Sequence, residues 1–120
     1  MLLYHGSNTE ISGIVLSKCG KYKDFGQGFY LTSLRQQAVD WAKKITKRFG
    51  TGMATLNKYD FVHGLVANDD ISAILETFLL GILPMAEISQ ALVYKELNDQ
   101  YSFHTDKALS HLKFLGSETV

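Results

Sequence analysis

The residues of this chain best suited to chemistry lie beside glycine in two short segments near its start. In the first segment, His5 ends an apolar stretch and Gly6 follows directly. A glycine lets a ligand approach the backbone closely, so that its N–H and C=O can act as recognition groups. The imidazole of His5 could bond a ribose hydroxyl. The alternative is a histidine beside a turn without any such role.

The second segment, residues 24–32, joins a pair of glycines to an aromatic strand. Gly26 and Gly28 could form a backbone nest for an anion. They do not make a dinucleotide-binding fingerprint, because the third glycine is absent and a strand is expected to follow instead of a helix. The flat ring of Tyr30 could stack on a base or on nicotinamide. A glycine turn that leads into a core strand is the open alternative.

A third polar face is predicted near the other end of the chain. Residues 100–104 alternate between polar and aromatic side chains, which is typical of a strand with one buried face. Gln100, Ser102 and His104 then share one face. Beside a cleft these groups would form a wall of a site, whereas beside solvent they would be an ordinary strand surface.

Composition and charge restrict the class of protein. The 120 residues are 46% hydrophobic and 12% aromatic, which fits one globular domain over residues 1–120. Twelve basic and twelve acidic side chains produce no overall field toward nucleic acid or membranes. The single cysteine, Cys19, excludes an internal disulfide, and no apolar run reaches membrane-spanning length. We therefore expect a cytoplasmic protein with no membrane partner.

Several other polar residues are better explained by structure than by chemistry. His63, His104 and His111 lack zinc-like spacing, so we expect no metal site. Asp69 and Asp70 fit the N-terminus of a helix, where carboxylates cap the backbone and meet the dipole. The basic residues between 43 and 48 read as the solvated face of a helix.

The element pattern predicts a mixed α+β domain. Strands are expected over residues 2–5, 28–32, 59–66 and 100–104, while residues 51–58 fit a strand or a loop. Ser33 and Gln36 form a capping-box pattern for a helix that ends near Gly50. Its predicted apolar face consists of Ala38, Trp41, Ala42, Ile45 and Phe49.

Three more helices are expected in the second half of the chain. The first follows residues 68–70 and ends at Gly81, and the second begins at Pro84 and ends before Asn98. The third begins at a Thr105 cap and continues through Leu115, because apolar residues recur at helical spacing.

Taken in order, these segments resemble a bacterial family of unknown function, the DUF3990 proteins, which is grouped with the ADP-ribosyltransferase-like fold. The resemblance covers nearly the whole chain. It is carried by residues 3–7, 24–32, 37–38, 41–42, 66–70, 97–105 and 107–109. The fold that it implies is a split pair of antiparallel β-sheets with flanking helices and NAD in the cleft between them.

The resemblance also implies a catalytic site. ADP-ribosyltransferases carry a His, a Tyr and a Glu on three separate strands. His5 takes the first position, with the Gly6 backbone holding the nicotinamide amide, and Tyr30 takes the second, stacking on nicotinamide. Gln100 stands where the Glu is expected. The implied NAD-binding residues are His5, Gly6, Ser7, Gly28, Tyr30 and Gln100.

By this resemblance the protein would transfer ADP-ribose from NAD to an unknown protein or nucleic-acid acceptor. It would be toxin-like, with an antitoxin-like protein as a partner. Gln100 departs from the family pattern, because an amide offers no negative charge to the cationic sugar of the transition state. Glu96 or Asp99 are alternative carboxylates.

The chain is also short between its first long helix and Tyr59, where similar proteins carry several tens more residues. This shortness could leave the second sheet incomplete. A non-catalytic, degenerate domain that binds a nucleotide or a protein is therefore the competing hypothesis.

Overall fold

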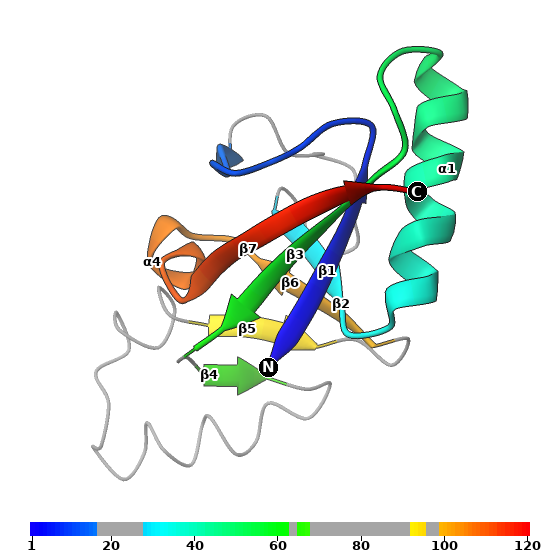
Figure 1. Cartoon of the computed structure of the whole chain (residues 1–120). Coiled ribbons are helices and arrows are strands. Elements are labelled where there is room, and N and C mark those ends of the chain that lie inside the picture. Colours follow the sequence, from blue (N-terminus) through cyan, green and yellow to red (C-terminus); the bar gives the residue numbers. More distant parts are fainter. Residues whose placement is uncertain (17–27, 63–64, 68–91, 96–98) are drawn as a thin grey trace, which may run out of the picture.

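The computed structural model describes residues 1–16, 28–62, 65–67, 92–95 and 99–120 (Figure 1). Its strands form a seven-stranded sheet with the order β4-β5-β6-β2-β1-β3-β7. The strands are β1 (Leu2–Ser7), β2 (Phe29–Thr32), β3 (Thr55–Phe61), β4 (Leu65–Ala67), β5 (Leu92–Lys95), β6 (Gln100–Phe103) and β7 (Leu112–Thr119). The helices are α1 (Arg35–Phe49) and α4 (Asp106–Leu109). The prediction of an α+β fold is confirmed.

The sheet has one narrow junction, between β1 and β2. β1 pairs with β3 over all six of its residues, but with β2 at a single position, Tyr4 opposite Thr32. On the far side of β2, β6 pairs with it along its whole length. In place of the two separate sheets that we expected, the described strands therefore form one sheet whose two parts meet at β1 and β2. All neighbours are antiparallel except β4 and β5, which run parallel.

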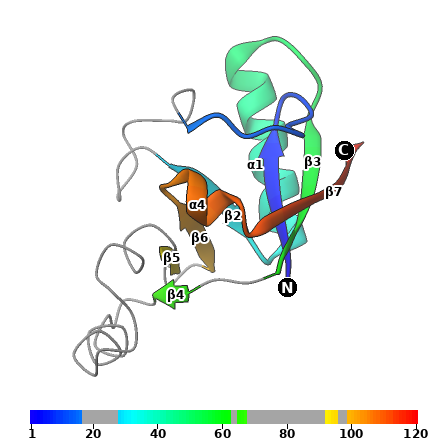
Figure 2. The same ribbon diagram turned by 90° about the vertical axis from the view of Figure 1, so that its left-hand side faces the viewer.

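The larger hydrophobic core covers one face of the sheet, which we call the core face. Side chains from both parts of the sheet meet there, so this core spans the junction. Its buried members are Leu3, Phe29, Leu31, Tyr59, Phe61, Val93, Tyr101, Phe103 and Ala108. Ile11 and Ile14 from the segment after β1, together with Leu109 at the end of α4, pack against it. Figure 2 shows α4 and this segment on the side of the sheet away from α1.

Helix α1 covers the opposite face of the sheet, which we call the helix face. There it packs on β1 and β3. The buried side of α1 consists of Ala38, Val39 and Ala42. Ala38 and Val39 pack with Leu56, and Tyr4 is partly buried beside them. The predicted apolar face was partly wrong, since Phe49 is 62% exposed. The stripe is centred on small residues because the helix backbone comes very close to β1.

The start of α1 also differs from the predicted capping box. Leu34 holds the N-cap position without a side-chain cap. Thr32 serves instead, accepting a hydrogen bond from the Leu34 N–H at 3.1 Å and donating one to Gln37 Oε1 at 3.2 Å. The hydroxyl of Ser33 donates to the Asp99 carboxylate. The predicted end is confirmed, since Gly50 has φ 69° and its N–H reaches Thr46 O at 2.9 Å.

The last predicted helix was correct at its start and wrong in its length. Thr105 Oγ1 accepts a hydrogen bond from the Ala108 N–H at 3.0 Å, as a cap should, but α4 ends at Leu109. Residues 112–119 form β7, which pairs with β3. Apolar residues at 112 and 115 fit a helix, but pairing with β3 satisfies the same backbone groups and tertiary contact decides between the two.

Two other boundaries moved for the same reason. β3 begins at Thr55, inside the stretch that fitted a strand or a loop. Leu92–Lys95, expected at the end of a helix, is β5 and pairs with both β4 and β6. The predicted helix that ends at Gly81, and residues 84–91 of the next predicted helix, lie outside the described residues.

Gly6 is where α1 approaches the sheet most closely. A Cβ added at this glycine would lie 2.1 Å from Ala38 O and 2.7 Å from Ala42 N, both backbone atoms of α1. Backbone atoms cannot rotate away as the end of a side chain can, so the helix as a whole would have to shift.

We therefore expect Gly6→Ala to lower the free energy of unfolding by about 3 kcal/mol, at the upper end of overpacking costs. Thermal or denaturant unfolding measures the change. Gly13→Ala is the matched control, because a Cβ there meets nothing within 4 Å. Equal stability of the two variants would contradict the close packing of α1 on β1.

Candidate functional site

His5 fills the junction between β1 and β2. Its Nδ1 lies 2.6 Å from the backbone oxygen of Tyr30. Because a carbonyl oxygen only accepts, Nδ1 carries the proton and donates. The imidazole also stacks on Phe29, with ring centroids 4.2 Å apart and planes at 29°. Backbone pairing of β1 with β2 is confined to Tyr4, so this side chain joins the two strands where the ladder has stopped.

Tyr30 lies on β2 in a buried position. The residue is 9% exposed, and its ring is nearly perpendicular to that of His104, with centroids 5.9 Å apart. Ser102 is directly opposite Tyr30 on β6, and its Oγ lies 3.0 Å from His104 Nε2. Tyr30, Ser102 and His104 therefore form one polar and aromatic group on neighbouring strands.

Gly28 makes room for this group. A Cβ at Gly28 would lie 2.6 Å from His104 Nδ1 and 3.0 Å from Phe103 O. The glycine thus lets His104 pack against the start of β2. The predicted anion nest needs Gly26 as well, and Gly26 lies outside the described residues.

Strand register assigns the predicted site residues to two faces of the sheet. Gln100 is opposite Thr32, and Thr32 is opposite Tyr4, so side chains at these positions share one face. Tyr30 and Gln100 therefore lie on the helix face. His5 belongs to the core face, as its contact with Phe29 confirms, and it reaches the backbone of Tyr30 through the junction. The structure brings Tyr30 and Gln100 onto adjacent strands of one face, while the His5 ring approaches from the other.

The remaining predicted residues are close to His5. Gly6 is buried, and α1 covers it on the helix face. Ser7 is also buried, at 9% exposure, and its Oγ lies 3.5 Å from Asn8 Oδ1. Both residues are paired with β3, Gly6 with Leu56 and Ser7 with Thr55.

Asp99, the acid next to Gln100, is engaged in structural contacts. It has a left-handed backbone with φ 62°. Its carboxylate accepts a hydrogen bond from the Ser33 hydroxyl and lies 3.7 Å from Lys95 Nζ. These contacts tie the start of β6 to the segment before α1, so Asp99 is committed away from the role of the missing Glu. Glu96, the other alternative, lies outside the described residues.

Asn57 is a neighbour of His5 that the sequence analysis did not identify. It is completely buried, directly opposite His5 on β3. Its Oδ1 accepts from the Ile11 N–H at 2.8 Å, and its Nδ2 donates to Thr9 O at 3.2 Å and His5 O at 3.4 Å. This amide fixes the chain after β1 beside His5. The available signal was an asparagine within residues 51–58, which fitted a strand or a loop, because asparagine is disfavoured in strands.

The side chain of Tyr59 also holds the segment after β1 in place. Its hydroxyl donates to Ile11 O at 2.5 Å, and its ring meets Phe29 at 5.7 Å and Phe114 at 5.5 Å. Burial of the hydroxyl, with a smaller contribution from the negative charge of Glu10, raises the pKa of Tyr59 well above its ordinary value. A continuous row of rings thus runs from His5 through Phe29 and Tyr59 to Phe114.

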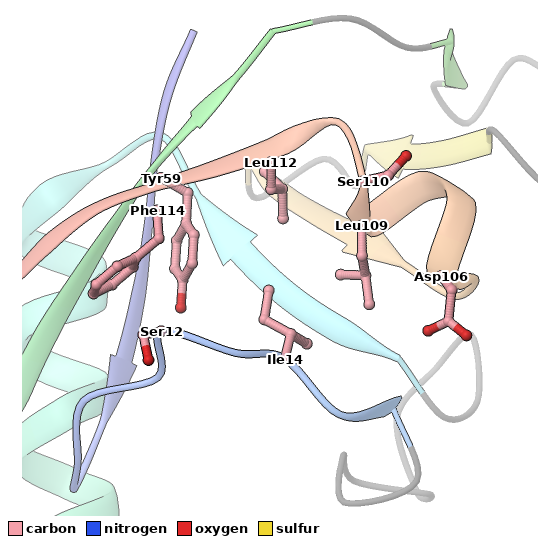
Figure 3. Close-up of a pocket in the computed structure, with 8 residues that line it drawn as sticks. All are labelled: Ser12, Ile14, Tyr59, Asp106, Leu109, Ser110, Leu112 and Phe114. Atoms are coloured by element: carbon pink, nitrogen blue, oxygen red, sulfur yellow. The ribbon is translucent and has the colours of Figure 1, made fainter.

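A pocket of about 270 Å³ opens at the far end of this row, beside Tyr59 and Phe114 (Figure 3). Its walls come from the segment after β1, from α4, and from β3 and β7. The lining residues are Ser12, Ile14, Tyr59, Asp106, Leu109, Ser110, Leu112 and Phe114. In Figure 3 the side chains of Ile14, Leu109 and Leu112 turn toward one another. The hydroxyl of Ser110 is turned to Lys107 O instead. Most of the surface exposed in the pocket is polar, and the pocket contains none of the predicted site residues.

Two further findings concern only the part of the chain that the structure describes. Within it, no three side chains of His, Cys, Asp or Glu gather as ligands of a metal ion would. No described helix is both long and apolar enough to cross a membrane.

These features define a small α+β domain in which a histidine joins two parts of a sheet beside a tyrosine and a glutamine on the next strands. A family model described as "Protein of unknown function (DUF3990)" matches residues 1–59 and 47–114, and the chain belongs to this family. The resemblance to DUF3990 is thereby confirmed. No curated protein and no solved structure matches the chain.

The two matched stretches overlap at residues 47–59, from the end of α1 into β3. The family match therefore divides in the region where the sequence analysis expected a shortened middle. The shortening itself stays a prediction.

The raised pKa of Tyr59 predicts a loss of stability in alkali. The folded state holds the phenol proton more tightly than the unfolded state, whose tyrosine ionises near pH 10. Below about pH 10 the free energy of unfolding therefore contains the full contribution of the Tyr59 hydroxyl. Above pH 10 this contribution falls by about 1.4 kcal/mol per pH unit, until the Tyr59 hydroxyl of the folded protein also ionises. Tyr59→Phe lacks this proton.

We expect Tyr59→Phe to be less stable than wild type at neutral pH by about 1 kcal/mol, because the bond to Ile11 is lost. Between about pH 9 and pH 11.5 the difference should shrink or reverse. Denaturant unfolding of both proteins at each pH measures it, and the other tyrosines contribute equally to both. A constant difference would contradict the proposed environment of the hydroxyl.

Proposed function

We propose that this protein binds NAD and transfers its ADP-ribose to a protein or nucleic-acid acceptor. One observation carries the proposal. His5, Tyr30 and Gln100 come from three strands that are consecutive in the sheet, β1, β2 and β6, at the junction where backbone pairing between β1 and β2 stops. The resemblance to ADP-ribosyltransferases assigns a His, a Tyr and a Glu to three separate strands.

The chemistry would use Tyr30 and Gln100, which share the helix face, as follows, while the His5 ring lies on the core face. Nicotinamide stacks on the Tyr30 ring, and Gln100 bonds a hydroxyl of the attached ribose. The glycosidic bond between nicotinamide and the ribose carbon breaks, and its electron pair leaves with neutral nicotinamide. A lone pair of the acceptor then forms the new bond to that carbon, and the acceptor's proton passes to solvent. Because Gln100 offers no charge to the cationic sugar, the expected turnover is slow.

The acceptor and the setting of this activity rest on the family resemblance alone. By that resemblance the protein is toxin-like and bacterial, and an antitoxin-like protein neutralises it. The neutral overall charge gives no preference for a nucleic-acid acceptor over a protein.

A second function, a non-catalytic domain that binds a nucleotide or a protein, is favoured by the packing around Tyr30. Tyr30 is 9% exposed, and its ring packs nearly perpendicular to the ring of His104. Gly28 leaves the space that His104 occupies. Stacking of nicotinamide on Tyr30 therefore requires His104 to turn aside, and a domain that never opens there would not turn over NAD.

Calorimetric titration of the folded protein with NAD, with released nicotinamide followed in the same sample, separates these functions. We expect Tyr30→Phe to keep the NAD affinity, because it keeps the flat ring. Tyr30→Leu should weaken binding about tenfold, as expected for the loss of one stacked ring. Thermal unfolding of each variant shows whether the domain is intact. Equal affinity of the folded Leu and Phe variants would remove Tyr30 from the site.

Restoring a carboxylate at position 100 tests the catalytic part of the proposal. We expect Gln100→Glu to speed nicotinamide release about 100-fold with little change in NAD affinity, because the charge acts on the transition state. Gln36→Glu on the exposed side of α1 makes the same chemical change away from the site. If NAD binds but release is equal in these two variants, the transferase class fails and the nucleotide-binding domain remains.

A further inference from the structure

Strand β7 is a long edge of the sheet with an unused side. It is the last strand in the sheet order, at the end away from β4 (Figure 2), and it has eight residues. Its inner side pairs with β3 from Leu112 to Thr119. Among the described residues, no backbone hydrogen bond reaches its outer side. An edge of this kind is a template for another strand.

The register with β3 determines which groups face outward. The N–H of Val120 bonds Ala54 O, and the N–H of Val62 bonds His111 O, so these pairs are hydrogen-bonded inward. Inward and outward positions alternate along an antiparallel ladder. A bulge at Leu115 restarts the alternation, because Lys58 is opposite Gly116 while Tyr59 is opposite Phe114. The residues whose N–H and C=O face outward are Leu112, Phe114, Ser117 and Thr119.

This pattern is symmetric about a point between Leu115 and Gly116. In an antiparallel pairing about a two-fold axis at that point, Leu112 meets Thr119 of the second copy and Phe114 meets Ser117. Every outward group then faces another outward group. We propose that β7 pairs with β7 of a second copy of this chain in this single register, which makes one continuous sheet through a dimer.

The charges fit the same register. Lys113 then lies opposite Glu118 of the second copy. Both side chains are on the helix face, because Lys113 is opposite Asp60 and Glu118 is opposite Leu56 on β3. Opposite charges directly across two strands stabilise the pair. No like charges meet in this register, and the pairing is therefore self-complementary in charge as well as in hydrogen bonds.

Two basic side chains of the same copy hold the Glu118 carboxylate in a position that suits the contact with Lys113 of the second copy. Arg35 lies 2.6 Å from its Oε1, and Lys58 Nζ lies 3.6 Å from the same atom. The hydrogen bond from Arg35 keeps the pKa of Glu118 below its ordinary value, so the carboxylate is charged at neutral pH. Lys113, on the neighbouring position of the second copy, extends this charge row across the axis.

The bulges of the two copies also lie opposite each other across the two-fold axis. On β3 the step from Asn57 to Tyr59 spans the same length as the step from Ser117 to Phe114 on β7. Because both copies contain the bulge, the spacing of their outward groups is equal. Leu115, which is 51% exposed, comes to lie beside the axis opposite Gly116 of the second copy. The glycine leaves space for it, and the dimer removes an apolar side chain from water.

Sedimentation equilibrium of the chain over a wide concentration range, without NAD, tests the proposal independently of the function at Tyr30. We expect a monomer–dimer equilibrium. Thr119→Pro should raise the dimer dissociation constant at least tenfold, because it removes an outward N–H from each copy while leaving the inward bonds intact. Thr119→Ala keeps the N–H and should dimerise as wild type does.

Lys113→Glu should weaken the dimer at least tenfold, since it places like charges across the axis. Lys107→Glu makes the same change at an exposed position on α4 and should have no effect. Thermal unfolding of each variant identifies any that fail to fold. A wild type that stays monomeric at high concentration overturns the proposal. So does a dimer that Thr119→Pro and Lys113→Glu, both folded, leave unchanged.

Discussion

The hydrogen bond from His5 Nδ1 to the Tyr30 carbonyl is the interaction on which the rest of the structure depends. It joins two parts of the sheet, β7-β3-β1 and β2-β6-β5-β4, that share a single backbone pair. The stack of the imidazole on Phe29 continues the hydrophobic core across the same junction. One side chain therefore supplies both the polar and the apolar link between the two parts.

The residues around the His5 hydrogen bond are closely packed on both faces of the sheet. On the helix face, Gly6 lets the backbone of α1 lie directly against β1. On the core face, Asn57 satisfies the backbone groups of the chain that follows β1 and also bonds His5 O. Gly6 and Asn57, the neighbours of His5, are thus constrained by packing. Any chemistry beside His5 would therefore use residues that also stabilise the fold.

The consequence for function lies on the other side of the junction. Tyr30 and Gln100 share a face, and the Tyr30 ring is closed in by His104. Membership of the DUF3990 family gives no established activity from which to argue. The question of whether this protein consumes NAD therefore reduces to a physical one, which is whether His104 leaves the Tyr30 ring when a planar ligand arrives.

Local chemistry was sufficient to predict several elements from the sequence. Glycine after α1, the Thr105 cap, and the polar–aromatic alternation of residues 100–103 act within a few residues, and each was confirmed. The roles of His5 and Tyr30 at a site came from the family resemblance, and they stay a prediction. The features that only the tertiary structure decided arise from long-range contacts. Pairing with β3 made residues 112–119 an edge strand, where a helix was expected through Leu115, and strand register put His5 and Tyr30 on opposite faces. These outcomes depend on contacts between residues far apart in the chain, and such contacts leave no periodicity within either segment.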